Sequence, residues 1–458
     1  MSALQKSILK SKLPPKMPRT SGASKLAPFG GARKRNYAPV PWKQYFEKSV
    51  DLETDGGMFR VYLSPEPDHP QRPRIITLHG GGYSGLSWAI FTEEITNMIH
   101  CQVVSLDIRG HGETKAKNPD DLSIETLIKD VEQVLHKLFG EDELPPLILL
   151  GHSMGGAIAV RASHLPALEP YIHGVAVIDV VEGTAMDALA SMQSFLRGRP
   201  THFKSIEHAI EWCVRSGQVR NVDSARVSMP SQIVNCSTNQ LAINEVDEYV
   251  SDDVTDEASE PCVRADVILE EGEGEGDGDG FVRPTPVANS GVLDDEDVSS
   301  YLINICDVRY SLYIIGIFVP KLLKFNYPIS IKFQISYYVC FVRNVTSQSH
   351  FRYRWRVDLS KTEQHWSGWF SGLSSAFLAT RAPRLLLLAS VDGLDRELTV
   401  GQMQGKFQMQ VLTRCGHAVH EDSPAEVSRV LASFLLRHRL TEATEEGELM
   451  HLVSAPGC

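Results

Sequence analysis

The sequence lacks several features that would place it in a membrane or outside the cell. Its longest charge-free apolar stretch, Tyr310–Val319, ends at Pro320 and is about half as long as a membrane span. The eight cysteines among 458 residues are scattered and form no Cys-x-x-Cys motif, which indicates reduced thiols rather than a disulfide framework. The N-terminal residues contain no apolar core of a signal peptide. We therefore expect a protein of the cytoplasm, the nucleus or both, without a membrane partner.

Basic charge is also in short supply. The chain carries 45 Lys and Arg against 57 Asp and Glu, a formal net charge of −12. Between Glu245 and Asp297, 19 acidic residues face only two arginines, and the rest of the chain is neutral to mildly basic. This distribution gives no basis for binding a nucleic acid. In residues 1–37, where Lys and Arg lie among Pro, Ser and Gly, we expect a basic disordered arm, with a nuclear import signal at Arg33-Lys34-Arg35 as the alternative.

From Phe59 onward, short apolar runs alternate with amphipathic helical patterns. Strands that are apolar throughout and separated by helices predict an α/β fold whose mostly parallel central sheet is covered by helices on both faces. The expected strands are Phe59–Leu63, Arg74–Leu78, Cys101–Leu106, Pro146–Leu150, Gly174–Ile178, Leu385–Leu388 and Phe407–Leu412, and the expected helices are Trp88–Ile99, Ser123–Leu138, Met154–Ser163, Met186–Phe195, Ile206–Ser216 and Ala425–Arg437.

A long insertion separates the late strands of this expected fold. We assign residues 38–236 to the first part of the α/β domain with the start of a helical cap, 237–300 to an acidic disordered loop, 301–350 to an atypical apolar insert, 351–440 to the second part of the domain and 441–458 to a tail. Charge repulsion and glycine entropy oppose order in EEGEGEGDGDG at 270–280; calcium binding is the alternative. The insert has the composition of translated non-coding sequence, and a membrane-touching or partner-binding segment is its alternative.

The clearest chemical signal is a serine between two glycines. An apolar strand runs into Gly151-His152-Ser153-Met154-Gly155 and then into a helix rich in small residues. A tight strand-to-helix turn of this kind holds a serine Oγ exposed above the sheet, and the glycines give room to the neighbouring strand and helix. We therefore predict that Ser153 is a nucleophile.

A second glycine run supplies candidate oxyanion donors. His79-Gly80-Gly81-Gly82 closes an earlier strand, and glycines leave backbone N–H groups unhindered for a tetrahedral intermediate. We predict that Gly81, Gly82 and Met154 form the oxyanion hole; a plain tight turn is the alternative.

The loop after the next strand carries DIRGHG, residues 107–112. Such loops commonly lie beside sites of this kind. We interpret Asp107 and Arg109 as an internal structural pair rather than as catalytic groups.

The general base is expected on a late loop. His417 follows the last strand and precedes the C-terminal helix, where the chain order serine, acid, histidine requires it. His420 is the rival base, and a His-x-x-His metal pair is formally possible, although we find no third ligand and serine chemistry needs no metal. For the orienting acid, both Asp179 and Asp392 follow a strand and satisfy the chain order, so the residues alone leave this choice open.

Several longer segments resemble the protein phosphatase methylesterase family. They are VPWKQYFE (40–47), DIRGHGET (107–114), GHSMGGAIAV (151–160), VVEGTAMDAL (180–189), MQGKFQMQ (403–410) and CGHAVHED (415–422). The resemblance covers roughly residues 38–235 and 353–440. It implies an α/β-hydrolase fold and a serine carboxylesterase that needs no cofactor, with Ser153 as nucleophile, Asp179 as acid and His417 as base.

The resemblance also implies the partner. The expected substrate is the methylated C-terminal leucine of the catalytic subunit of protein phosphatase type 2A, and Met403, Lys406 and Met409 are the candidate contact residues. Two alternatives stay open at this point: another ester or thioester hydrolase of the same fold, and a non-catalytic regulator that binds the phosphatase and masks its site.

Overall fold

A mixed sheet of nine strands forms the centre of the protein. The computed structural model describes residues 35–140, 143–183, 196, 198–253, 351–390 and 394–450. The sheet order is β1-β2-β4-β3-β6-β7-β11-β12, with β5 paired to β2. The strands are β1 (Lys48–Thr54), β2 (Gly57–Leu63), β3 (Arg74–Leu78), β4 (Gln102–Leu106), β5 (Lys115–Ala116), β6 (Leu147–His152), β7 (Ile172–Ile178), β11 (Arg384–Leu388) and β12 (Gln408–Val411).

In the sheet order β4-β3-β6-β7-β11-β12, each strand is parallel to the next. The pairs β1–β2, β2–β5 and β2–β4 at one side of the sheet are antiparallel. This arrangement confirms the predicted fold class. Because parallel strands end at the same edge of a sheet, the loops after β3, β6, β7 and β12 lie close together. These loops carry the HGGG run, Ser153, Asp179 and His417.

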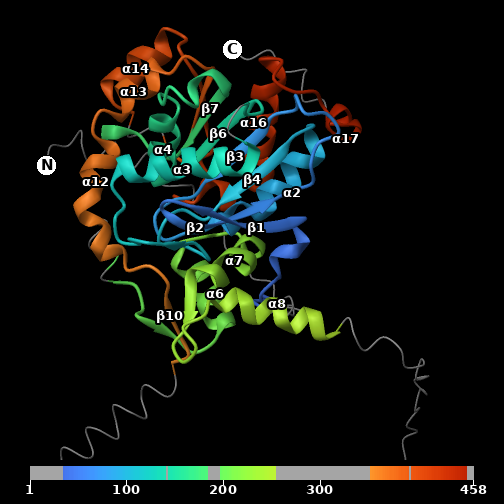
Figure 1. Cartoon of the computed structure of the whole chain (residues 1–458), viewed down its shortest axis with the longest axis vertical. Helices are drawn as coiled ribbons and strands as arrows, with labels where there is room; N and C mark the ends of the chain where they lie inside the picture. The colour runs from blue at the N-terminus through green and yellow to red at the C-terminus, as the bar shows by residue number, and fades with distance from the viewer. Residues whose placement is uncertain are drawn as a thin grey trace, which may run out of the picture. The chain divides into compact units, whose positions relative to one another are not determined.

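Helices cover both faces of the sheet (Figure 1). Alternate side chains of each buried strand point to opposite faces: Ile148 and Leu150 of β6 pack into one apolar cluster, and Leu147 and Leu149 pack into another. The first cluster includes residues of α2 (Ala89–Met98) and α16 (Pro424–Arg437). The second includes residues of α3 (Ile124–Phe139), α4 (Met154–Ala162), α12 (Glu363–Phe370) and α13 (Leu373–Ala379).

A cap lies between β7 and β11 in the chain. It contains α6 (Ile206–Ser216), α7 (Val222–Ser228), α8 (Ala242–Asp253) and a three-stranded antiparallel sheet, β8 (His202–Phe203), β10 (Tyr353–Trp355) and β9 (Ile233–Asn235), with β10 in the middle. Strands separated by more than a hundred residues therefore pair directly. In Figure 1, α6, α8 and β10 gather on one side of the central sheet.

The expected start of disorder at residue 237 is wrong. Helix α8 follows Leu241, which is buried together with Ile243. On its polar side, Glu245 accepts a hydrogen bond from the Tyr353 hydroxyl at 2.5 Å, and Asp247 accepts one from the indole N–H of Trp42 at 2.6 Å. The acidic residues of this segment thus have specific donors in the folded domain, which composition alone does not indicate.

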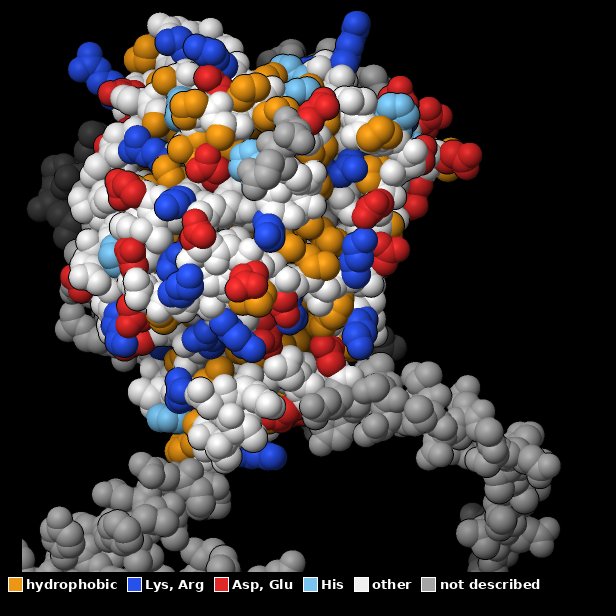
Figure 2. Space-filling view, viewed as in Figure 1, with side chains coloured by type: hydrophobic (Ala, Val, Ile, Leu, Met, Phe, Trp, Pro, Cys, Tyr) orange, Lys and Arg blue, Asp and Glu red, His pale blue; other side chains and the backbone are white. Residues whose placement is uncertain are grey.

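The other predicted segments of the insertion lie outside the described residues. These are the helix expected at Met186–Phe195, the acidic run at 270–280 and the apolar insert at 301–350, and the domain boundaries beyond residue 253 stay a prediction. Among the described helices, none is long and apolar enough to cross a bilayer. On the face drawn in Figure 2, Lys and Arg side chains alternate with Asp and Glu side chains over the described residues.

Candidate active site

Ser153 occupies a strained turn between β6 and α4. Its backbone has φ 52° and ψ −118°, a conformation that residues other than glycine rarely adopt. A Cβ on Gly151 would lie 2.1 Å from the carbonyl oxygen of Gly155, and a Cβ on Gly155 would lie 2.1 Å from the carbonyl oxygen of Leu78. Both flanking positions therefore require glycine, and the turn places the Ser153 side chain at the carboxyl edge of the sheet.

Asp179 and His417 form a direct pair at the same edge. Asp179 follows β7, also with a positive φ of 50°, and its Oδ2 lies 2.8 Å from Nδ1 of His417. Its Oδ1 accepts the backbone N–H of Ala389 at 2.9 Å. Burial acts to raise the pKa of Asp179, but the hydrogen bond and charge interaction with His417 outweigh it, so the net pKa is lowered. The carboxylate is thus held ionised beside the imidazole. Asp392, the other candidate acid, lies outside the described residues.

His152 supports the backbone that carries His417. Its Nε2 lies 2.9 Å from the carbonyl oxygen of His417, and because a carbonyl only accepts, Nε2 of His152 is the donor. The two rings also pack with centroids 4.7 Å apart. Among the hydrogen bonds of the described residues, none joins the Ser153 hydroxyl to His417. Such a contact is often loose in a free enzyme and tightens when substrate binds.

His420, the rival base, is a core residue. It lies on α15 (Val419–Asp422), its exposed fraction is 1%, and its ring stacks against Trp88 with centroids 4.1 Å apart. Burial lowers the pKa of His420 to about 3. Asp179 pairs with His417 and not with His420. Within the described ranges, no group of three His, Cys, Asp or Glu side chains is placed to hold a metal ion.

The three predicted oxyanion donors differ in availability. Met154 is the first residue of α4, so its N–H has no acceptor within the helix. The N–H of Gly82, in contrast, already donates to Nε2 of His111 at 2.8 Å. The side chain of Leu359 covers this loop, with a methyl carbon 3.7 Å from where a Cβ on Gly81 would lie. Gly81 and Met154 are therefore the two candidates without a competing acceptor among the contacts of the described residues.

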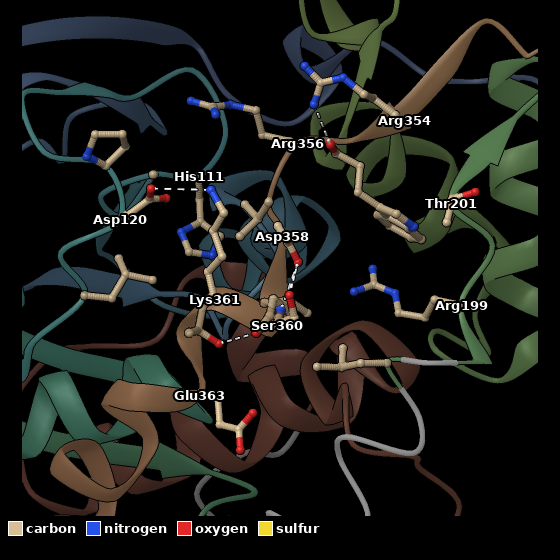
Figure 3. A pocket seen from close by; sticks show the side chains of 18 of the residues that line it. His111, Asp120, Arg199, Thr201, Arg354, Arg356, Asp358, Ser360, Lys361 and Glu363 are labelled. Carbon is tan, nitrogen blue, oxygen red and sulfur yellow. Dashed lines mark hydrogen bonds and ion pairs between the residues drawn. The ribbon is translucent and has the colours of Figure 1, made fainter. Parts of the chain in front are cut away.

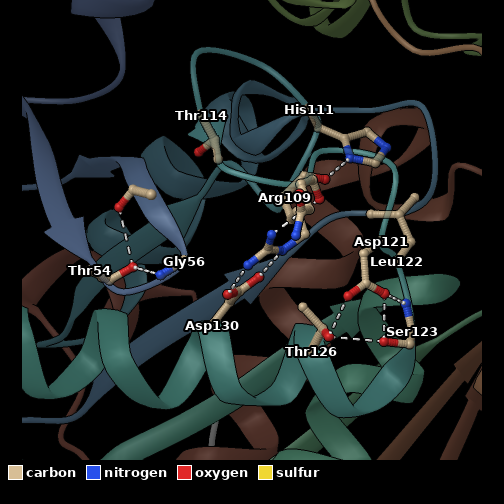
Figure 4. Close-up of polar contacts among 12 residues, drawn as sticks. Thr54, Gly56, Arg109, His111, Thr114, Asp121, Leu122, Ser123, Thr126 and Asp130 are labelled. Carbon is tan, nitrogen blue, oxygen red and sulfur yellow. Dashed lines mark hydrogen bonds and ion pairs between the residues drawn. The ribbon is translucent and has the colours of Figure 1, made fainter.

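The expected structural pair of Asp107 with Arg109 is wrong. The Asp107 carboxylate accepts the backbone N–H groups of Gly85 at 2.7 Å and Glu113 at 2.8 Å. Arg109 instead donates from Nε and Nη2 to the two carboxylate oxygens of Asp130, each at 2.6 Å (Figure 4). Both residues are structural, as expected, but Asp107 orders the loop and Arg109 ties it to α3.

The candidate contact residues for a partner lie on and after α14 (Arg396–Met403). Met403 is 84% exposed, Lys406 is exposed, and Met409 in β12 is partly buried against the apolar cluster. Met403 and Lys406 therefore face solvent close to the strand that leads to His417, whereas part of Met409 belongs to the core.

Comparison with known proteins identifies the broad family of the chain. Residues 75–235 and 318–430 match the model of the Alpha/beta hydrolase family, and the chain belongs to that family. Among solved structures it is similar to E-2-(Acetamidomethylene)succinate Hydrolase, with 14% identity, a TM-score of 0.49, and coverage of 85% of this chain and 98% of that one.

Curated relatives narrow the assignment. The chain is 45% identical to Protein phosphatase methylesterase 1 of Homo sapiens over 96% of this chain and 97% of the human protein. It is 35% identical to Probable protein phosphatase methylesterase 1 of Caenorhabditis elegans, over 94% of this chain and 84% of that protein. The chain belongs to the protein phosphatase methylesterase family and is a methylesterase of the α/β-hydrolase fold.

Proposed function

We propose that the chain hydrolyses the methyl ester of the C-terminal leucine in the catalytic subunit of protein phosphatase type 2A. The names of its relatives support a protein phosphatase as the substrate. The resemblance of the motifs at 180–189 and 403–410 supports the particular subunit, and the exposed Met403 and Lys406 are the proposed contacts. No cofactor takes part in the proposed reaction.

The proposed mechanism is an acyl-enzyme cycle. Ser153 Oγ attacks the ester carbonyl while Nε2 of His417 takes its proton. The N–H groups of Gly81 and Met154 stabilise the oxyanion. Collapse of the intermediate breaks the bond to the methoxy oxygen, and His417 returns the proton so that methanol leaves. Water then attacks the acyl-enzyme with His417 again as base, which yields the free carboxylate and restores Ser153.

One observation carries this mechanism: the 2.8 Å contact between Asp179 Oδ2 and Nδ1 of His417. The acceptor carboxylate fixes the ring proton on Nδ1 and leaves the lone pair on Nε2, which is the tautomer that a general base needs. The same carboxylate stabilises the imidazolium that forms when Ser153 gives up its proton.

The test is hydrolysis of a small chromogenic ester and of methylated phosphatase by Ser153→Ala, with Ser367→Ala, an exposed serine of α12, as matched control. We expect Ser153→Ala to lose at least about 10⁴-fold in turnover on both substrates, because no other group can form the acyl-enzyme, while Ser367→Ala keeps its activity. Retained turnover in Ser153→Ala would contradict the assignment. A wild type that binds the phosphatase but hydrolyses neither ester would favour a masking regulator.

A further inference from the structure

A cavity of about 800 Å³ lies beside the oxyanion loop. Two of its lining residues also contact that loop: His111 accepts the N–H of Gly82, and the Leu359 side chain lies over Gly81 and Gly82. The lining does not include Ser153, the candidate nucleophile. The cavity therefore adjoins the oxyanion loop through His111 and Leu359, and its lining does not reach the candidate nucleophile.

Arg199 is the distinctive charged group of this cavity. Its guanidinium lies over the Trp355 ring, 3.6 Å from the centroid, and Figure 3 shows it directed into the cavity. The indole N–H of Trp355 donates to the carbonyl oxygen of Pro200 at 2.7 Å, which holds the ring against the segment that carries Arg199. A stack of this kind fixes the plane of the guanidinium and leaves its edge free for a planar anion.

The other cations of the lining already have partners. Arg354 donates to Oδ1 of Asn239 at 2.7 Å, Arg356 donates to the carbonyl oxygen of Gly112 at 3.3 Å, and Lys361 lies 3.5 Å from Asp120. For Arg199, the described residues supply no side-chain hydrogen-bond acceptor and no ion-pair partner, and its Nε is buried without one.

An unpaired, largely desolvated guanidinium is costly, because its charge has given up water without a counter-ion. Burial lowers the pKa of Arg199 to about 10, so the group stays protonated at neutral pH and its positive charge still lacks a counter-ion among the described residues. Among the described residues, no carboxylate of the lining forms an ion pair with Arg199, neither Asp120, which pairs with Lys361, nor Asp358 or Glu363. The described part of the chain therefore supplies no counter-ion for Arg199, and an anionic ligand in the cavity would provide one.

We infer that Arg199 binds an acidic or phosphorylated side chain of the polypeptide substrate, a few residues before the esterified C-terminus. This inference rests on the proposed function, since it takes the ligand to be part of the substrate. Because the cavity adjoins the oxyanion loop, a chain whose terminal ester reaches Ser153 can extend along that loop into the cavity. A carboxylate or phosphoryl group matches the fork of a guanidinium and would gain charge-assisted hydrogen bonds.

Binding of labelled peptides tests this inference. The probes are fluorescein hexapeptides that end in leucine methyl ester and carry Asp, Asn or phosphoserine at one position, scanned along the peptide. They are titrated by fluorescence anisotropy into Ser153→Ala, which does not consume them. We expect Asp or phosphoserine at one position to bind about 10- to 100-fold more tightly than Asn, and comparing the two acidic peptides distinguishes a carboxylate from a phosphoryl source.

The matched variants are Arg199→Gln and Arg354→Gln, each in the Ser153→Ala background. Arg199→Gln should abolish the preference for the acidic peptide, whereas Arg354→Gln should retain it, with circular dichroism to verify that both are folded. A purely structural role of Arg199 would weaken all the peptides alike and leave the ratio unchanged. Equal binding of acidic and neutral peptides at every position, or a preference that survives Arg199→Gln, would overturn the inference.

Failure of the proposed function has a different signature. If the wild type leaves every leucine methyl ester intact, the reaction assignment fails. The peptide-binding ratio is measured without turnover, so it still decides whether Arg199 reads a negative charge.

Discussion

Replacing Asp179 by asparagine should switch the tautomer of His417. An asparagine keeps the size of the side chain but has one acceptor oxygen and one NH₂ donor. The backbone N–H of Ala389, which now donates to Oδ1 at 2.9 Å, requires an acceptor at that position. The amide oxygen will therefore face Ala389 and the NH₂ group will face Nδ1 of His417, which must become an acceptor. The ring proton then lies on Nε2, where it blocks proton transfer from Ser153.

The expected loss follows from this geometry. With the wrong tautomer and without a carboxylate to stabilise the imidazolium, turnover should fall by about 10⁴-fold, as in other serine, histidine and aspartate triads. The assay is kcat and KM for a small chromogenic ester at neutral pH. We expect the effect in kcat with little change in KM, because Asp179 does not touch the ester.

Asp392→Asn is the matched comparison, because Asp392 also follows a sheet strand and was the other candidate from the sequence. Its loss should stay below about tenfold, an effect on the barrier of less than ~1.4 kcal/mol. A larger loss in Asp392→Asn than in Asp179→Asn would refute the reasoning and return the acid role to Asp392. An unchanged rate in Asp179→Asn would show that the 2.8 Å contact with His417 has no part in catalysis.

Two further predictions concern stability. Asp130→Asn should lower the free energy of unfolding, measured by urea denaturation, by about 3–5 kcal/mol, because it leaves the buried Arg109 charge without its partner, whereas Asp51→Asn, in a partly exposed pair, should cost less than about 1 kcal/mol; equal losses would contradict this. Burial lowers the pKa of His111 from 6.5 to about 4, so the unfolded chain takes up the proton first and stability is lost as the pH falls through this window. We expect His111→Gln to remove about 2 kcal/mol of the loss between pH 7 and pH 5, whereas the exposed control His173→Gln should keep the full pH slope.

The periodic part of the fold could be predicted from the sequence. Strand β3 and helix α6 have the expected bounds, Arg74–Leu78 and Ile206–Ser216, because each has a clear apolar period and a glycine, proline or capping residue near its ends. The two-residue strand β8 and the three-residue strand β10 are too short for a period. They form only because distant segments of the cap meet, which is tertiary information. Helix α8 was missed for the opposite reason, since its acidic composition hid the apolar side that contains Ile243 and Val246.

The candidate site divides in the same way between local and long-range information. The glycine requirement at Gly151 is local, because a Cβ there would meet the carbonyl oxygen of Gly155 in the same turn, whereas the requirement at Gly155 comes from Leu78 of the neighbouring strand β3. The partner of Arg109 is not local: Asp130 lies 21 residues away on α3, and several carboxylates between them would have fitted the sequence equally well. The sequence assigned no role to Arg199, because what distinguishes it is the lack of an acceptor among the described residues around it, and only the folded structure defines that surrounding.

Burial also explains why a site with several histidines has a single candidate base. The ring of His152 packs against two other imidazoles. Its centroid lies 4.6 Å from that of His420 and 4.7 Å from that of His417. Burial first, and then the neighbouring imidazoles, lower the pKa of His152 well below its usual value and that of His420 to about 3. In the proposed mechanism, both rings therefore stay neutral while His417 accepts the proton of Ser153, so they do not repel the imidazolium. A protonated neighbour at this distance would raise the barrier to the proposed proton transfer, and the lowered pKa values of His152 and His420 avoid this cost.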